Sequence, residues 1–295
     1  MDSALSLRIV FERGIALDDT AIEEHLNSSA LVKKLTADYI EHPLFAVFRI
    51  MGISEIPHME RLPYTRRLLE YINSNIATKE GFAPLGGVNE IVPCYNAMLL
   101  QAYCRLGFHE SAQAQAALGW IKHYQLFERN STSAWQHEGV CKHGGCLRNT
   151  PCYIGIGKTV LALIDYHERV NDSKVEALLK QGVSYMLHHN MYLRLSSDMP
   201  ISSHITDIMM PQNYALSLTD LVYIIGKKGL QNEHGTERIV QLLKEKQSEP
   251  DKWKIDYLYK YRGYVPFEGR RKTSEWISQL FSIWLEALVN GSETR

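Results

Sequence analysis

Several features are absent from this 295-residue sequence, and each absence excludes a class of protein. No apolar run approaches the roughly 20 residues that a helix needs to cross a bilayer, so no transmembrane segment is predicted. No charge of one sign dominates, because 32 Lys and Arg stand against 33 Asp and Glu. The resulting net charge of -1 argues against nucleic acid as a partner. Gly/Ser-rich linkers are also missing, so we expect a single domain over residues 1–295.

Cysteine is scarce and odd in number. Five Cys at irregular spacing do not predict a disulfide framework. The first residues, MDSALSLRIVFERG, have no basic region before their short apolar stretch, which argues against a cleaved signal peptide. We therefore expect a cytoplasmic protein with reduced thiols.

The sequence does contain a repeated pattern. Five segments run apolar at helical spacing, and four of them begin with proline, whose missing N–H is tolerated in the first turn of a helix. Amphipathic segments with a charged outer face follow them, which is typical of helices that cover a buried inner layer. The inner helices are expected to start near Pro43, Pro93, Pro151, Pro211 and Thr273.

This alternation of inner and outer helices predicts an all-α fold. About five helix pairs span residues 42–290, and residues 1–41 form an N-terminal helical cap. Such pairs stack as an open solenoid or close into a ring, and the pattern leaves both arrangements open. Long loops before the inner helices favour closure into an α/α toroid, an incomplete α/α barrel, because loops gathered at one mouth commonly build a site.

The ends of the outer segments carry a family resemblance. In LLKEKQSEPDKW, Gln247 and Trp253 match the QxxxGxW motif of squalene cyclases, and Asp251 occupies the glycine position. The chain thus resembles the terpenoid cyclase and protein prenyltransferase superfamily, and more closely its small prenyltransferase or squalene-cyclase repeat proteins. The resemblance implies a toroid whose central cavity binds an isoprenoid or similar apolar small molecule and cyclises, isomerises or transfers it.

Two acidic signatures of that superfamily are absent. The sequence has neither the DxDD of squalene-hopene-type cyclases nor the DDxxD of ionising terpene synthases. The resemblance therefore favours an enzyme without supplying its catalytic acid. Two other functions stay open, namely a non-catalytic repeat protein that binds a lipid or a protein, and a carbohydrate-active toroid with two facing carboxylates.

Cysteine and histidine concentrate in the segment HEGVCKHGGCLRNTPC. Thiolates and imidazoles are the ligands that zinc prefers, so the segment predicts a zinc site. Its C-x4-C-x5-C spacing differs from paired C-x2-C knuckles, and reduced thiols in a pocket-facing loop are the other interpretation. The candidate zinc ligands are His137, Cys141, His143 and Cys146.

Three residues near the expected helix starts are candidates for catalysis. Cys152 follows a proline at a helix start, as Cys94 does, and backbone N–H groups there favour a thiolate. Glu90 and Asp207 precede inner helices, as Glu268 does, and a carboxyl desolvated at the mouth would act as a general acid. Asp207 is the preferred acid because its neighbours in sequence are apolar. In the alternative interpretation each carboxylate caps its helix.

The segment KIDYLYKYRGYVPFEGRRK predicts an anion-binding patch. Arg forks and Tyr hydroxyls suit a diphosphate, and the next helix would present its N-terminus to the same anion. Protein prenyltransferases, which the chain resembles, bind their isoprenoid diphosphate with residues of these types. Alternating aromatic residues also fit an extended loop packed on its neighbour. The candidate substrate-binding residues are Tyr257, Tyr259, Tyr261, Arg262, Arg270 and Arg271.

Overall fold

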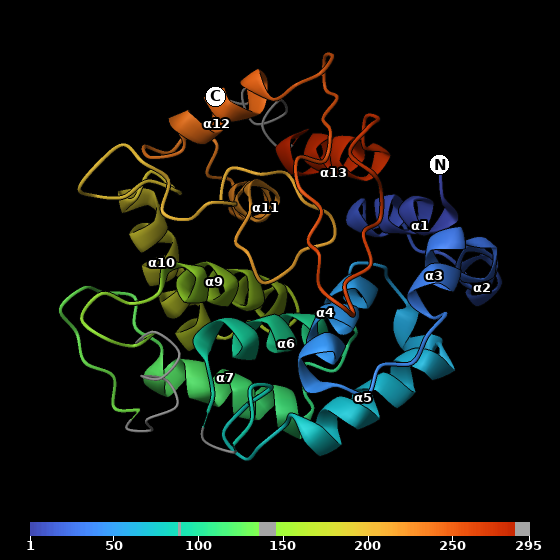
Figure 1. Ribbon diagram of the computed structural model, residues 1–295, viewed down its shortest axis with the longest axis horizontal. Helices are drawn as coiled ribbons and strands as arrows, with labels where there is room; N and C mark the ends of the chain where they lie inside the picture. Colours follow the sequence, from blue (N-terminus) through green and yellow to red (C-terminus); the bar gives the residue numbers. More distant parts are fainter. Residues whose placement is uncertain (88–89, 136–145, 287–295) are drawn as a thin grey trace.

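The computed structural model describes residues 1–87, 90–135 and 146–286. Within these ranges the protein is all-helical, with isolated β-bridges and no strand, as the sequence predicts (Figure 1). In the part of the chain that is described, no helix is both long and apolar enough to cross a membrane.

Five helices correspond to the expected inner segments, and most of their residues are buried because apolar side chains occupy nearly every face. Proline occupies the first turn of the first two helices, as predicted. Cys152 forms the N-cap of the third, and Ser274 precedes the fifth, one residue beyond Thr273. The five helices are α4 (Pro43–Ser54), α6 (Pro93–Arg105), α9 (Tyr153–His167), α11 (Leu218–Lys228) and α13 (Glu275–Glu286).

The fourth inner helix begins later than its proline predicts. Helix α11 starts at Leu218 rather than near Pro211. Ser217 and Asp220 form a reciprocal capping box there, which satisfies the first backbone N–H groups of the helix. Residues 211–217 instead form a buried irregular segment that leads into α11.

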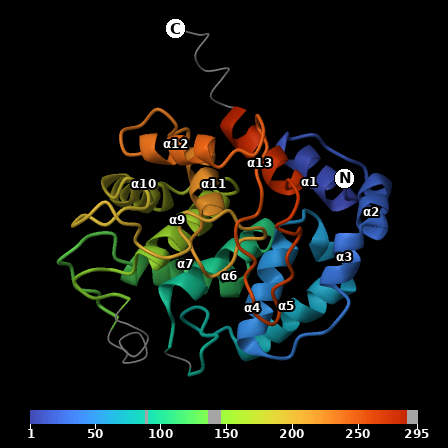
Figure 2. The same cartoon turned by 45° about the horizontal axis from the view of Figure 1, so that its top comes forward.

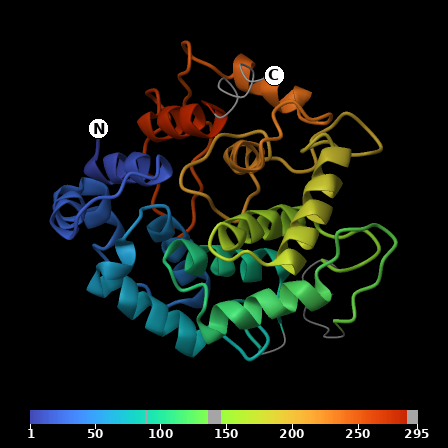
Figure 3. The same ribbon diagram turned by 180° about the vertical axis from the view of Figure 1, so that it is seen from behind.

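Outer helices follow the inner ones in sequence. Helix α5 contacts α4, α7 contacts α6, and α10 contacts α9, so three of the expected pairs are in contact. Figures 1 and 3 show α5, α7 and α10 at the periphery, outside the inner helices. The outer helices are α5 (Pro63–Asn75), α7 (Ala112–Tyr124), α10 (Ser173–His188) and α12 (Glu237–Glu245), with a 3-10 turn η1 (Met59–Arg61) before α5.

Trp253 connects the fourth outer helix to the last inner helix. Its indole N–H donates to the Leu243 carbonyl of α12 at 2.9 Å, and its backbone N–H donates to Ser278 Oγ of α13 at 3.2 Å. Asp251, at the glycine position of the QxxxGxW pattern, has a φ of 55°, in the left-handed region that glycine adopts most readily. The pattern therefore coincides with a turn in the segment between α12 and α13.

Three further helices precede α4 in the chain. They are α1 (Ser3–Glu12), α2 (Asp19–Ser28) and α3 (Ala30–Leu35). The side chains of Asp2, Asp18 and Ser29 accept hydrogen bonds from the first backbone N–H groups of these helices. Each helix therefore has its own start signal in the sequence.

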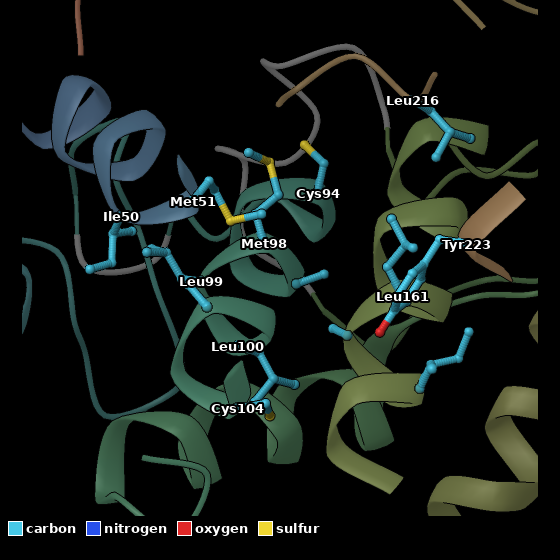
Figure 4. Packing of buried hydrophobic residues seen from close by; sticks show 14 of the residues in the cluster. Ile50, Met51, Cys94, Met98, Leu99, Leu100, Cys104, Leu161, Leu216 and Tyr223 are labelled. Atoms are coloured by element: carbon cyan, nitrogen blue, oxygen red, sulfur yellow. The ribbon is translucent and has the colours of Figure 1, made fainter. Parts of the chain in front are cut away.

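Contacts between helices run in chain order and return to their starting point. Helix α4 contacts α6, which contacts α9; α9 contacts α11, and α11 contacts α13. Helix α13 then contacts α1, α1 contacts α3, and α3 contacts α4. Figure 4 draws buried side chains between α4, α6 and α9, among them Met51, Met98 and Leu161. Burying each such side chain stabilises the fold by roughly 1.5–3 kcal/mol.

The segment 255–273 crosses over α4 (Figure 2). Arg49 of α4 donates to the Gly263 carbonyl at 3.1 Å, and Tyr264 donates to the Pro211 carbonyl at 3.0 Å. A Cβ on Gly263 would lie 2.3 Å from the Phe45 carbonyl oxygen, so only glycine permits this close approach. The crossing segment is therefore fixed against the helix that it covers.

Candidate functional site

The N-terminal ends of α6 and α9 bring cysteines together. Cys152 is the N-cap of α9, and its backbone N–H donates to the Cys146 carbonyl at 3.1 Å. A hydrogen bond with the Cys146 thiol is the main influence that lowers the pKa of Cys152, to about 6. Burial opposes this effect, whereas the N–H groups of Ile154 and Gly155 act in the same direction. The role of Cys152 in catalysis stays a prediction.

Cys94, at the corresponding place on α6, has the opposite environment. Its side chain is buried, and burial together with the nearby Cys152 raises its pKa to about 12. The two Pro-Cys pairs therefore lie close enough for their charges to interact, and Cys152, unlike Cys94, lines the pocket described next. Equivalent positions in the repeat thus carry thiols with different chemistry.

A pocket of about 620 Å³ opens beside Cys152. Its walls are mainly aromatic and aliphatic, and they come from the start of α9, the end of α10 and the loop that follows α10. Two arginines and one histidine supply most of its charge and hydrogen-bonding capacity. The residues used below are Arg129, Cys152, Tyr153, Tyr185, His189, Arg194, Leu195 and Ile201.

His189 at the end of α10 is a buried, neutral imidazole. Its Nδ1 lies 2.9 Å from the Leu193 carbonyl, which only accepts, so Nδ1 carries the proton and Nε2 a lone pair. Burial is the main influence that lowers the pKa of His189, and the Arg129 charge acts in the same direction. Within the described residues Nε2 has no hydrogen-bond partner, so it can accept a proton from a ligand.

Arg129 and Arg194 give this pocket its positive charge. Arg129 lies in the segment after α7 and Arg194 in the loop after α10, so neither belongs to a helix. Guanidinium groups bind carboxylates and phosphates through paired hydrogen bonds. Sequence analysis did not identify either arginine or His189, because no local pattern distinguishes them from other loop residues.

The predicted acids do not enter this pocket. Asp207 accepts a hydrogen bond from His204 at 2.8 Å, and its side chain is 25% exposed rather than enclosed by its apolar neighbours in sequence. Glu90 is also partly exposed, in the segment before α6. Glu268 accepts hydrogen bonds from Ser274 and from the backbone N–H groups of Glu275 and Trp276, which supports the capping interpretation.

The tyrosines of the predicted anion patch pack on two different neighbours. Tyr257 packs against His204 with ring centroids 4.2 Å apart and the rings tilted by 33°. Tyr259 and Tyr261 lie 5.5 and 5.2 Å from the ring of Phe48 on α4. The guanidinium of Arg262 lies 5.8 Å from the ring centroid of Phe45 on the same helix. Arg270 and Arg271 are exposed. The segment thus fits the packed-loop interpretation.

The predicted zinc ligands are described only in part. His137, Cys141 and His143 lie outside the described residues, and Cys146 lies beside Cys152. Within the ranges that the structure describes, no group of three or more His, Cys, Asp or Glu side chains is arranged to hold a metal ion. The zinc site stays a prediction.

A second polar cluster lies at the opposite, C-terminal ends of the inner helices. Arg8 of α1 pairs with Glu12 at 2.7 Å and with Glu55, just after α4, at 3.0 Å. Arg105 at the end of α6 pairs with Asp165 of α9 at 2.6 Å and with Glu55 at 2.9 Å. All of these side chains are at most 8% exposed, so the ion pairs are buried.

Two residues of α11 complete the cluster. We call it the C-terminal charge cluster because it lies at the C-terminal ends of the inner helices; its members are Arg8, Glu12, Glu55, Arg105, Asp165, Glu168, Tyr223 and Lys227. Lys227 lies 3.2 Å from Glu12 and 3.1 Å from Glu168, and Tyr223 donates to Asp165. A pocket of about 200 Å³ lies among these groups. Charged residues within otherwise apolar helices, such as Arg105 and Asp165, are the sequence signal that identifies the cluster, because an unpaired buried charge is costly.

A fully buried ion pair connects α9 to α11 between the two ends. Lys158 lies 3.1 Å from Asp220, and both side chains have no exposed surface. Asp220 also accepts hydrogen bonds from the backbone N–H and the hydroxyl of Ser217. Burial lowers the pKa of Lys158, while the charge of Asp220 opposes this effect. Lys158 therefore contributes to the packing of α9 against α11.

Comparisons with known proteins do not identify the chain: no protein-family model, curated protein or solved structure matches it. The resemblance to terpenoid cyclases and protein prenyltransferases stays a prediction. Function is therefore argued from the pocket beside Cys152 and from the C-terminal charge cluster.

Proposed function

We propose that the protein is an α/α toroid that binds an apolar small molecule carrying an anionic group, in the pocket beside Cys152. Support for the toroid is the order of contacts from α4 to α13 and back to α4 through α1 and α3. The proposal keeps the ligand class that the sequence predicts, an isoprenoid or similar molecule. It moves the site from the central axis to the side formed by α9 and α10.

The observation that carries the proposal is the composition of this pocket. Tyr153, Tyr185, Leu195 and Ile201 supply apolar walls, which favour a hydrocarbon chain or ring. Two arginines at the same pocket favour a phosphate or carboxylate at one end of that ligand. A volume of about 620 Å³ lies within the range of roughly 300–1,000 Å³ that is typical of small-molecule sites.

The pocket also contains two groups that can interact with the ligand's polar end. Cys152 lies at the N-terminus of α9, where the helix dipole favours a bound anion and the thiol can donate a hydrogen bond to it. His189 presents an unprotonated Nε2 that accepts a hydrogen bond from a protonated ligand oxygen. Binding alone, without turnover, is sufficient for this proposal.

Calorimetric titration with farnesyl diphosphate tests the proposal. Farnesol lacks the anion and inorganic diphosphate lacks the chain, so both are expected to bind at least about 10-fold more weakly. Arg129→Gln and Arg194→Gln each remove a guanidinium and are expected to weaken binding by roughly 10- to 100-fold. Absence of farnesyl diphosphate binding would overturn the proposal.

Arg270→Gln/Arg271→Gln is the matched control, because it removes two exposed arginines from the anion patch predicted by sequence. This double variant is expected to bind farnesyl diphosphate like the wild type. If it loses binding while Arg129→Gln and Arg194→Gln do not, the ligand binds at the predicted patch and not at the pocket beside Cys152.

A further inference from the structure

The pocket within the C-terminal charge cluster has hydrogen-bonding groups that the fold leaves unused. Arg105 Nη1 forms an ion pair with Glu55 Oε1 at 2.9 Å, whereas the buried Nη2 has no hydrogen-bond partner within the described residues. Arg169, which also lines the pocket, is exposed and donates to the Arg105 carbonyl only at 3.3 Å. The pocket therefore has spare donors for an anionic oxygen.

The buried carboxylates, by contrast, have cationic or hydroxyl partners. Glu12 contacts Arg8 and Lys227 through its two oxygens, and Asp165 accepts from Arg105 and Tyr223 through its own. Glu168 differs, because its Oε1 contacts Lys227 while its side chain is 47% exposed at the rim of the pocket. Glu168 is therefore available to a cationic group that enters from solvent.

The charge of the lining selects against a simple anion. The lining contains four cations, Arg8, Arg105, Arg169 and Lys227, and three carboxylates, Glu12, Asp165 and Glu168. Glu55, which pairs with Arg8 and Arg105 next to the lining, supplies a fourth carboxylate. The last turns of α1, α6, α9 and α11 also end here, and helix C-termini carry partial negative charge. A ligand with no net charge fits this field better than one that brings an uncompensated negative charge.

We infer that this pocket binds a small zwitterion, an apolar amino acid, with its carboxylate at Arg105 and Arg169 and its ammonium group at Glu168. Phe11, which is 48% exposed, and Pro57 supply an apolar surface in the lining for the amino-acid side chain. A volume of about 200 Å³ suits a molecule of this size rather than a long isoprenoid. The inference is independent of the ligand proposed for the pocket beside Cys152.

Calorimetric titration of the full chain with L-leucine tests this inference. Two partial analogues serve as probes: 4-methylpentanoate, which has the carboxylate alone, and 3-methylbutylamine, which has the ammonium alone. Leucine is expected to bind at least about 10-fold more tightly than either analogue. If 4-methylpentanoate binds as tightly as leucine, the pocket is a simple anion site. If none of leucine, valine and methionine binds, the pocket is filled by solvent. Either result overturns the inference.

Two rim variants locate the site without removing a buried charge. Glu168→Gln and Arg169→Gln are each expected to weaken leucine binding by at least about 10-fold. Glu176→Gln is the matched control for the first, because Glu176 is also a half-exposed carboxylate paired with a lysine, at 2.8 Å. Arg238→Gln is the control for the second, at 48% exposure. Loss of binding in the controls, or unchanged binding in the rim variants, would place leucine elsewhere.

Discussion

The two ends of helix α9 differ in almost every chemical respect. At its N-terminus, Cys152 lies beside a pocket with aromatic walls and a neutral His189. At its C-terminus, Asp165 belongs to a buried set of ion pairs that reaches from α1 to α11. The helix dipole contributes to this difference. Its positive N-terminal end favours a thiolate at the first turn, and its negative C-terminal end favours nearby cations such as Arg105.

The pocket beside Cys152 is a candidate binding site, whereas the buried ion pairs at the other end of α9 hold several helices together. The N-terminal pocket takes its two arginines, Arg129 and Arg194, from loops, where substitutions are expected to leave the fold intact. The C-terminal charge cluster connects α1, α4, α6, α9 and α11, so its charges contribute to the stability of the whole domain. Substitutions at the two ends should therefore have different effects.

The largest effect is expected from Arg105→Met. Removing this guanidinium leaves Asp165 and Glu55 as buried carboxylates with fewer partners, and breaking a buried pair in this way costs about 3–5 kcal/mol. The free energy of unfolding from urea titration measures this loss. Lys180→Met, which breaks the exposed pair with Glu176, is the control and should leave stability close to that of the wild type. Equal losses in both variants would contradict the structural role of the cluster.

A slightly smaller loss of folding stability is expected at low pH. Burial alone would raise the pKa of Glu12, but the charges of Arg8 and Lys227 lower it from 4.5 to about 2. A depressed carboxyl pKa contributes stability that is fully present above pH 4.5 and is lost as the pH falls through about 2. Its size is about 3 kcal/mol.

Urea titrations between pH 6 and pH 2 measure this contribution. The wild type is expected to lose about 3 kcal/mol more than Glu12→Gln over this range, because the amide that replaces the carboxyl does not titrate. Parallel pH profiles for the two proteins would show that the charges of Arg8 and Lys227 do not act on Glu12 as the geometry indicates.

The third effect concerns the rate of cysteine alkylation at the N-terminus of α9. At pH 7 iodoacetamide is expected to alkylate Cys152 at least about 100-fold faster than Cys94, because the thiolate reacts and Cys94, with a pKa of about 12, stays protonated. Peptide mass spectrometry resolves the two sites. The pH midpoint for alkylation of Cys152 is expected to lie below that of an ordinary thiol, and Cys146→Ala should raise it by removing the thiol hydrogen bond. Equal rates at Cys152 and Cys94 would refute the difference between the two thiols.

The sequence predicts the helices better than it predicts what surrounds them. Proline marks the starts of α4 and α6 because its geometry suits the first turn of a helix. An N-terminal position alone does not distinguish Cys152 from Cys94, because the lowered pKa of Cys152 depends mainly on its hydrogen bond with Cys146. Pro211 fails as a start signal because the capping box at Ser217 and Asp220 determines where α11 begins. Local signals thus compete, and sequence does not rank them.

The candidate site is less predictable because it depends on contacts between distant residues. Arg129, His189 and Arg194 come from the ends of two different outer helices and their loops, and no spacing relates them to Cys152. Asp207 has apolar neighbours in sequence, but its own side chain contacts His204 and stays partly exposed. Neighbours along the chain do not determine which side chains share a pocket.

The contact between α1 and α13 has a consequence for the order of folding. Arg8 donates a hydrogen bond to Glu55, and both residues lie in the first part of the chain, 47 residues apart in sequence. Helix α13, which contacts both α11 and α1, is the last described helix in the chain. During synthesis the early helices can therefore assemble on one another while the partner that joins α11 to α1 is still missing. Closing contacts of such long sequence separation are slow to form, so the docking of α13 is expected to limit the rate at which the whole domain becomes native.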